Sequence, residues 1–121
     1  MKIAVRIENS KGSHQFSATL SENKSAKAFA DLLKKGAVTV KMNDYGGFEK
    51  VGPLGTSLPR SDERITTSAG DIILYQGNQI TIYYDKNSWN FTRLGKLDGV
   101  DSAGLKKILG DGGVTARFSL E

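Results

Sequence analysis

One stretch decides the fold of this chain: DIILYQGNQITIYY, residues 71–84. Its two ends, residues 71–75 and 80–84, are rich in Ile, Leu and Tyr, which favour β-strands. The segment between them contains Gly77 and Asn78, the residue types that tight turns require. The pattern predicts a β-hairpin, and it is the clearest secondary-structure signal in the sequence.

The N-terminal part of the chain predicts a second hairpin followed by a helix. Residues 2–8 and 14–20 alternate between apolar and polar side chains on either side of a turn at residues 9–12. Ser21 or Asn23 can cap a helix, and Gly36 can end it. The apolar stripe of that amphipathic helix is formed by Ala26, Phe29, Ala30 and Leu33.

The remaining elements are shorter. Residues 38–42, 91–94 and 114–120 read as strands, and Ser102 is expected to cap a short helix that ends at Gly110. A turn at residues 110–113 leads into the last strand. Residues 43–70 hold both prolines and show no regular period, so this segment either hides short strands or has a functional role.

The order of these elements predicts the fold class. About seven strands and two helices follow one another without a βαβ rhythm, and a sheet of that kind removes its edges most easily by closing into a barrel. A chain of 121 residues is long enough for one core. We therefore expect a mainly β protein, with residues 1–121 forming a single domain.

Composition excludes several classes of function. The absence of Cys rules out disulfides and thiolate chemistry, and a single His leaves little basis for a metal site, so we expect no metal and no cofactor. The net charge is +4, but Lys and Arg are scattered among the acids, which argues against a nucleic-acid partner. There is no signal peptide and no apolar span, so we expect a cytoplasmic protein without a membrane partner.

Several segments, in order and at matching spacing over about residues 16–120, resemble the small bacterial cyclophilin-like proteins. They are Ala18-Thr19-Leu20, Ser25-Ala26-Lys27-Ala28-Phe29, Leu32-Leu33, Glu49-Lys50, Leu58-Pro59, Ala69-Gly70-Asp71-Ile72, Leu74-Tyr75 and Phe91-Thr92-Arg93-Leu94-Gly95-Lys96-Leu97. The resemblance implies a closed, cyclophilin-like β-barrel of about eight strands with one amphipathic helix and one short helix. It does not imply catalysis, because the Phe-His-Arg segment of the prolyl isomerases of that fold is missing, and no catalytic residue is assigned.

The candidate ligand cleft comes from two loop regions that carry aromatic and charged side chains. Loops at a barrel mouth are where such a fold binds ligands. An alternative for Arg93 is a structural ion pair with Glu49 or Asp71. The candidate residues are Tyr45, Phe48, Glu49, Arg60, Tyr84, Trp89 and Arg93.

Three functional readings follow. The first is a non-enzymatic module that binds a peptide or a small molecule in this cleft. The second is a peptidyl-prolyl cis-trans isomerase with a divergent active site. In this reading Arg93 or Arg60 would act as a hydrogen-bond donor positioned over an apolar pocket for the proline. The third is a homo-oligomer that pairs through an exposed barrel strand.

Overall fold

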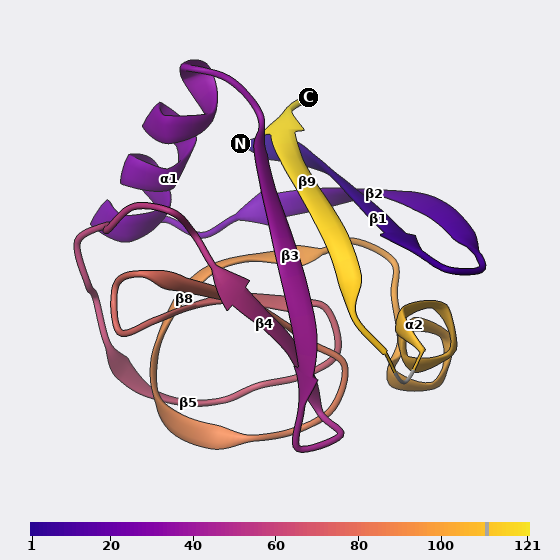
Figure 1. Cartoon of the computed structure of the whole chain (residues 1–121). Helices are drawn as coiled ribbons and strands as arrows, with labels where there is room; N and C mark the ends of the chain where they lie inside the picture. Colours follow the sequence, from indigo (N-terminus) through magenta and orange to yellow (C-terminus); the bar gives the residue numbers. More distant parts are fainter. Residues whose placement is uncertain (111) are drawn as a thin grey trace.

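The computed structural model describes residues 1–110 and 112–121; Asp111, in the predicted turn at residues 110–113, lies outside them. The described residues form nine strands and two helices (Figure 1). In chain order these are β1 (Lys2–Asn9), β2 (Gly12–Leu20), α1 (Lys24–Lys34), β3 (Val38–Tyr45), β4 (Glu49–Pro53), β5 (Glu63–Thr66), β6 (Asp71–Tyr75), β7 (Gln79–Tyr83), β8 (Ser88–Leu97), α2 (Ser102–Leu109) and β9 (Val114–Leu120).

Eight of the strands form a closed antiparallel barrel. Their order is β2-β1-β9-β3-β4-β7-β6-β8, and pairing of β2 with β8 closes the circle. The short strand β5 lies outside this circle and pairs with the first half of β8. Figure 1 shows α1 on one side of β3 and α2 beyond β9 on the other. The predicted barrel of about eight strands with two helices is confirmed.

Helix α1 is capped by one of the two residues expected from the sequence, whereas the cap of α2 lies one residue before the expected one. Asn23 caps α1 by accepting a hydrogen bond from the backbone N–H of Ala26, at 2.7 Å. The cap of α2 is Asp101, whose carboxylate accepts from the backbone N–H of Gly104, and not Ser102 as the sequence suggested. The Ser102 hydroxyl instead donates to the carbonyl of Tyr84 at 2.7 Å, which ties α2 to the end of β7. No described helix has the length and apolarity needed to cross a membrane.

The irregular segment at residues 43–70 hides strands. The third strand continues to Tyr45, and β4 and β5 both lie within the segment. The strand predicted at residues 91–94 is also longer, because β8 runs from Ser88 to Leu97. Periodicity missed β4 because its short run includes Glu49, Lys50, Gly52 and Pro53, types that are depleted in strands.

The sheet carries apolar side chains on both of its faces over β6, β7 and β8. Ile72 and Leu74 point into the barrel, where they join the main core. Ile73 lies on the opposite face with Tyr83 and Phe91 in a second, smaller core outside the barrel. Burial on both faces explains why the strand at residues 71–75 is a continuous apolar run and not an alternating one.

A buried lysine links β4 to β3 and to the segment between α2 and β9. The side chain of Lys50 is fully buried, and its ammonium group lies 3.2 Å from Asp44 Oδ1. It also donates to the backbone carbonyls of Gly110 at 2.8 Å and Gly112 at 2.6 Å. These three acceptors match the three donors of an ammonium group, so the charge is fully hydrogen-bonded although it is buried.

Closure of the barrel requires a glycine at one position. Gly95 on β8 pairs with Leu20 of β2 on one side and with Ile72 of β6 on the other. A Cβ atom at this position would lie 2.5 Å from the carbonyl oxygen of Thr19 and 3.1 Å from the Cα of Leu20. Both neighbours are backbone atoms of the partner strand, so they cannot move aside without separating the two strands.

We therefore expect Gly95→Ala to lower the free energy of unfolding by about 3 kcal/mol, the range of overpacked core positions. Urea denaturation followed by circular dichroism measures the change. The matched control is Gly112→Ala, because a Cβ there meets no atom within 4 Å. Equal stability of the two variants would contradict the role of Gly95 in barrel closure.

Candidate functional site

The outer face of the barrel holds a cavity of about 350 Å³, which we call the aromatic pocket. Strands β3, β4, β6, β7 and β8 all contribute to it. Its floor is the side of the sheet opposite the barrel interior. The lining residues are Tyr45, Glu49, Val51, Tyr75, Gln79, Tyr83, Asn87, Trp89 and Phe91.

Aromatic rings form a continuous series beneath and around the pocket. Phe48 stacks on Tyr83 with their ring centroids 6.0 Å apart and meets Tyr45 edge-on at 5.9 Å. Phe91 continues the series, at 5.7 Å from Tyr83 and 6.3 Å from Tyr75. The rings of Phe48, Tyr83 and Phe91 are therefore held by one another beneath the pocket.

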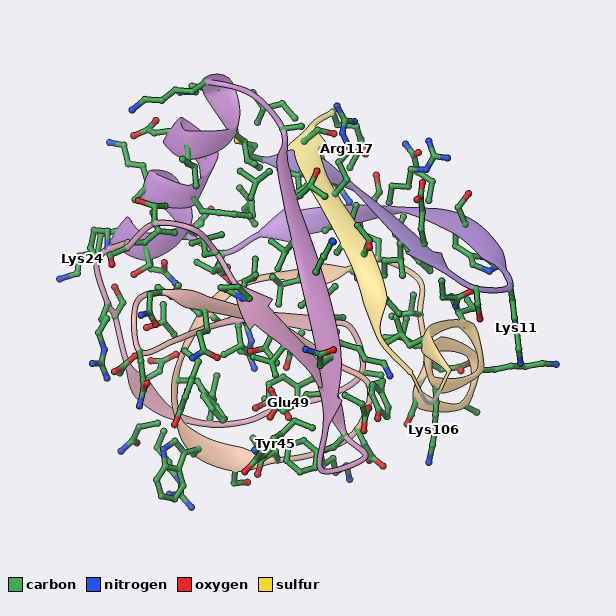
Figure 2. The ribbon with its side chains drawn as sticks, viewed as in Figure 1. Lys11, Lys24, Tyr45, Glu49, Lys106 and Arg117 are labelled. Carbon is green, nitrogen blue, oxygen red and sulfur yellow. The ribbon has the colours of Figure 1, made fainter. Side chains whose placement is uncertain are left out.

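One carboxyl group lies among these rings. Strand register places Glu49 directly between Tyr45 on β3 and Tyr83 on β7, and Figure 2 shows Tyr45 and Glu49 next to each other. The residue is only 8% exposed, and its Oε1 accepts a hydrogen bond from the Tyr83 hydroxyl at 3.3 Å. Among the described residues, no Lys or Arg forms an ion pair with Glu49.

The environment of Glu49 favours its neutral form. Burial raises the pKa of Glu49 from 4.5 to about 7, and the negative charge of Asp44 acts in the same direction. The hydroxyl groups of Tyr83 and Thr81 oppose this change by donating to the carboxylate. Burial likewise raises the pKa of the Tyr83 hydroxyl, which therefore stays protonated and available as a donor. The carboxyl group thus changes its charge near neutral pH.

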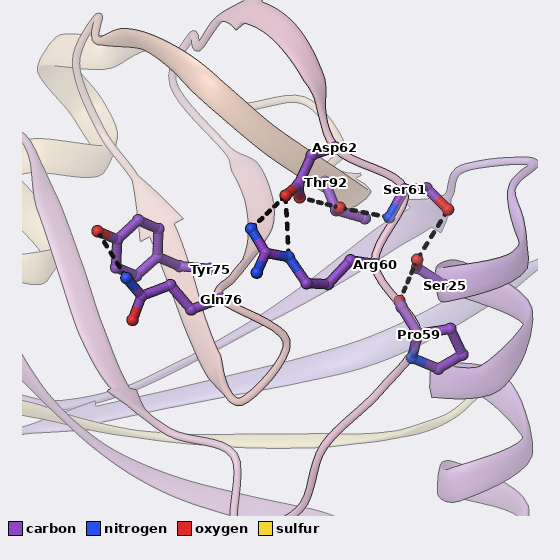
Figure 3. Close-up of polar contacts among 8 residues, drawn as sticks. All are labelled: Ser25, Pro59, Arg60, Ser61, Asp62, Tyr75, Gln76 and Thr92. Atoms are coloured by element: carbon purple, nitrogen blue, oxygen red, sulfur yellow. Dashed lines mark hydrogen bonds and ion pairs between the residues drawn. The ribbon is translucent and has the colours of Figure 1, made fainter.

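The rim of the pocket is formed by Trp89, which is 58% exposed. Trp89 pairs with Ile65 of β5, so the short outer strand holds the backbone at this position. It also lines a second cavity of about 440 Å³, the polar hollow, with Tyr75 and Arg60 among its other residues. Figure 3 shows Tyr75 and Gln76 facing Arg60, which donates two hydrogen bonds to Asp62.

The structure brings together some of the residues expected at the cleft. Tyr45, Glu49 and Trp89 line the aromatic pocket, and Phe48 packs against one of its rings. Arg60 lies in the adjacent polar hollow.

The two other expected residues lie elsewhere. Tyr84 is buried in the main core, where its hydroxyl donates to Asp44. The guanidinium of Arg93 lies 3.2 Å from Asp71 Oδ2, the structural ion pair that was the alternative.

Sequence analysis missed the part of the pocket that comes from the central hairpin. From this hairpin, Tyr75, Gln79 and Tyr83 line the pocket. Val51, Asn87 and Phe91, which lie outside the hairpin, were also missed. A signal was present, because Gln79, Thr81 and Tyr83 alternate with Ile80 and Ile82 and must face the other side of the sheet. The strand could have been read as amphipathic, with a polar and aromatic outer face. The described residues contain no group of three or more His, Cys, Asp or Glu side chains that could hold a metal ion.

The geometry defines a class of protein: a closed eight-stranded antiparallel barrel with a ligand-sized pocket on its outer face. The family model of the cyclophilin-like family matches residues 10–119, so the chain belongs to the cyclophilin-like family. No curated protein matches the chain.

The chain is also similar to a solved structure, that of McbB in complex with tryptophan, with a TM-score of 0.62 and 14% sequence identity. The match covers 97% of this chain and 44% of that protein, so this chain spans less than half of McbB. At this identity the similarity concerns the fold alone.

The raised pKa of Glu49 predicts a specific pH dependence of stability. Between pH 4.5 and about 7 the folded protein holds this proton more tightly than the unfolded chain, so the free energy of unfolding falls as pH rises through that range. Glu49→Gln removes the effect and should be more stable than the parent protein by about 2 kcal/mol at pH 8, after allowance for partial solvent screening.

Urea denaturation at pH 4, 6 and 8 tests this expectation. The two proteins should be nearly equal at pH 4, where Glu49 is protonated and similar to Gln in shape. Glu63→Gln is the control, since Glu63 is exposed on β5. A stability difference that does not change with pH would rule out a buried, titrating Glu49.

Proposed function

We propose that the chain is a small-molecule-binding module and that the aromatic pocket is its binding site. The observation that carries this proposal is the combination of a ligand-sized cavity, walls of packed aromatic rings and one buried carboxyl group. Cavities of about 300–1,000 Å³ with mostly apolar walls and few polar groups are typical of ligand sites.

The energetics of Glu49 support the same proposal. A buried carboxylate without a cationic partner lowers stability at neutral pH, and a Gln or Leu at this position would remove that penalty. Residues that lower stability in this way concentrate at functional sites. The exposed Trp89 at the rim supports the same proposal, because Trp is among the residue types enriched at binding hot spots.

The similarity to McbB adds limited support. McbB is in complex with tryptophan in its solved structure, and its fold is similar to this barrel. An aromatic amino acid is a molecule of the size that the aromatic pocket can hold. We favour a small molecule over a peptide because a volume of about 350 Å³ lies in the range of small-molecule sites.

The alternative of a prolyl isomerase gains no support from the geometry. This function needs an arginine that acts as a hydrogen-bond donor over an apolar pocket. The guanidinium of Arg93 pairs with Asp71, and that of Arg60 pairs with Asp62. Neither arginine lines the aromatic pocket.

The test is a titration of the ¹⁵N-labelled protein with a panel of aromatic amino acids, indoles and phenols at millimolar concentration. Trp89 is the only Trp in the chain, so its indole N–H gives a single, unambiguous signal. We expect shifts that cluster at Tyr45, Glu49, Tyr83 and Trp89. Trp89→Ala should weaken binding about fivefold or more.

Leu120→Ala is the matched control, since Leu120 is another partly exposed apolar residue, far along the chain on β9. It should leave the affinity unchanged. Shifts that cluster outside the aromatic pocket, or the absence of shifts with every member of the panel, would contradict the proposed function.

A further inference from the structure

One of the buried carboxylates has no cationic partner among the described residues. Two acidic residues are buried among those that the structure describes, Glu49 and Asp71. Asp71 pairs with Arg93, whereas Glu49 has no cationic partner in the described part of the chain. A buried carboxylate of this kind needs a positive charge to be stable in its ionised form.

The neighbouring lysine cannot supply that charge. Successive residues of a strand point to opposite faces of the sheet, so Glu49 faces the pocket and Lys50 faces the barrel interior. The ammonium group of Lys50 is occupied by Asp44 and two backbone carbonyls. Although partial burial opposes it, hydrogen bonds from Tyr84 and Lys50 hold the pKa of Asp44 below its usual value.

The rings beside Glu49 suit a cation. Tyr45 and Tyr83 flank the carboxyl group in register from the two neighbouring strands, and Trp89 stands at the rim. The faces of aromatic rings carry partial negative charge and attract ammonium groups, most strongly when water is excluded. A carboxylate within a set of such rings therefore offers a cation both an ionic partner and ring faces.

We propose that the ligand of the aromatic pocket carries a positively charged amine or quaternary ammonium group, bound between the Glu49 carboxylate and the exposed rings of Tyr45 and Trp89. This inference rests on the proposed function, because it names the chemical class of the ligand for the same pocket. A neutral ligand would leave the Glu49 carboxylate without a cationic partner. An anionic ligand would be repelled by that carboxylate. No Lys or Arg is among the described residues that line the pocket and could bind an anion.

The inference predicts how binding depends on pH. The titratable and charged groups around Glu49 are Asp44 and Tyr45 on β3, Tyr83 on β7 and, behind it, Tyr75 on β6. The pKa of Glu49, raised by burial to about 7, lies near neutrality. A ligand with a permanent positive charge should therefore bind more tightly as pH rises through about 7.

The experiment compares three probes of similar shape and different charge: phenethylamine, 2-phenylethanol and 3-phenylpropionate. Binding is followed by the fluorescence of Trp89 and by the amide signals of the pocket residues. At pH 8 we expect phenethylamine to bind about tenfold more tightly than 2-phenylethanol, and 3-phenylpropionate to bind most weakly. Glu49→Gln should remove the preference for the amine without weakening the alcohol, and Glu63→Gln should keep it.

A permanent cation, benzyltrimethylammonium, isolates the protonation of Glu49. Its affinity should fall about tenfold between pH 8 and pH 6 for the parent protein and stay constant for Glu49→Gln. Tyr45→Ala is a second variant that does not touch the carboxyl group; Tyr45 is 63% exposed, so loss of its ring should leave the fold intact. It should weaken the amine more than the alcohol.

The outcomes separate the two proposals. Equal binding of the amine and the alcohol, or an amine preference that survives in Glu49→Gln, would overturn the inference and leave the proposed function standing. If none of the probes shifts the signals of the pocket residues, while the wider panel also fails, the proposed function itself is wrong. An amine preference that depends on Glu49 and on pH supports both.

Discussion

Three residue pairs join β2 to β8: Ala18 with Leu97, Thr19 with Lys96 and Leu20 with Gly95. This short ladder turns an open sheet into a barrel, and closure separates an inner face from an outer one. The inner face becomes the main core, which includes Ile72, Leu74 and Ile82. The outer face of the same strands carries the second core and the aromatic pocket. The site therefore depends on backbone hydrogen bonds that lie away from it.

The alternation of side chains along β4 places two opposite charges where they cannot meet. Lys50 points inward and neutralises Asp44 while it ties the strand to the turn before β9. Glu49 points outward into a ring-lined cavity and finds only hydroxyl groups. Two adjacent residues thus have different roles. Lys50 links parts of the barrel by hydrogen bonds, and Glu49 places a carboxyl group in the pocket.

The sequence predicted the fold well where the local pattern was regular. The hairpin at residues 71–84, the N-terminal hairpin and the helix capped by Asn23 all follow from side-chain periodicity and capping. It did not reveal β4, because the strand is stabilised by its two neighbours and by the buried contacts of Lys50, which are non-local. The site was only partly predictable for the same reason. Tyr45, Glu49 and Trp89 stand out in the sequence because they lie in segments that were predicted as loops. Tyr83 and Phe91 look like core residues until the sheet is known to have two buried faces.

The double-sided sheet has a consequence for how proteins of this architecture diversify. Residues that face the pocket and residues that face the barrel interior alternate along the same strands, yet they belong to two separate clusters. Substitutions in clusters that share no contacts have nearly additive effects. Under the proposed function, ligand preference can therefore change through substitutions at Tyr45 or Trp89, which belong to neither cluster, while the scaffold keeps its stability. The exposed rim of the pocket and the folded core of the barrel are thus encoded by different residues of the same strands.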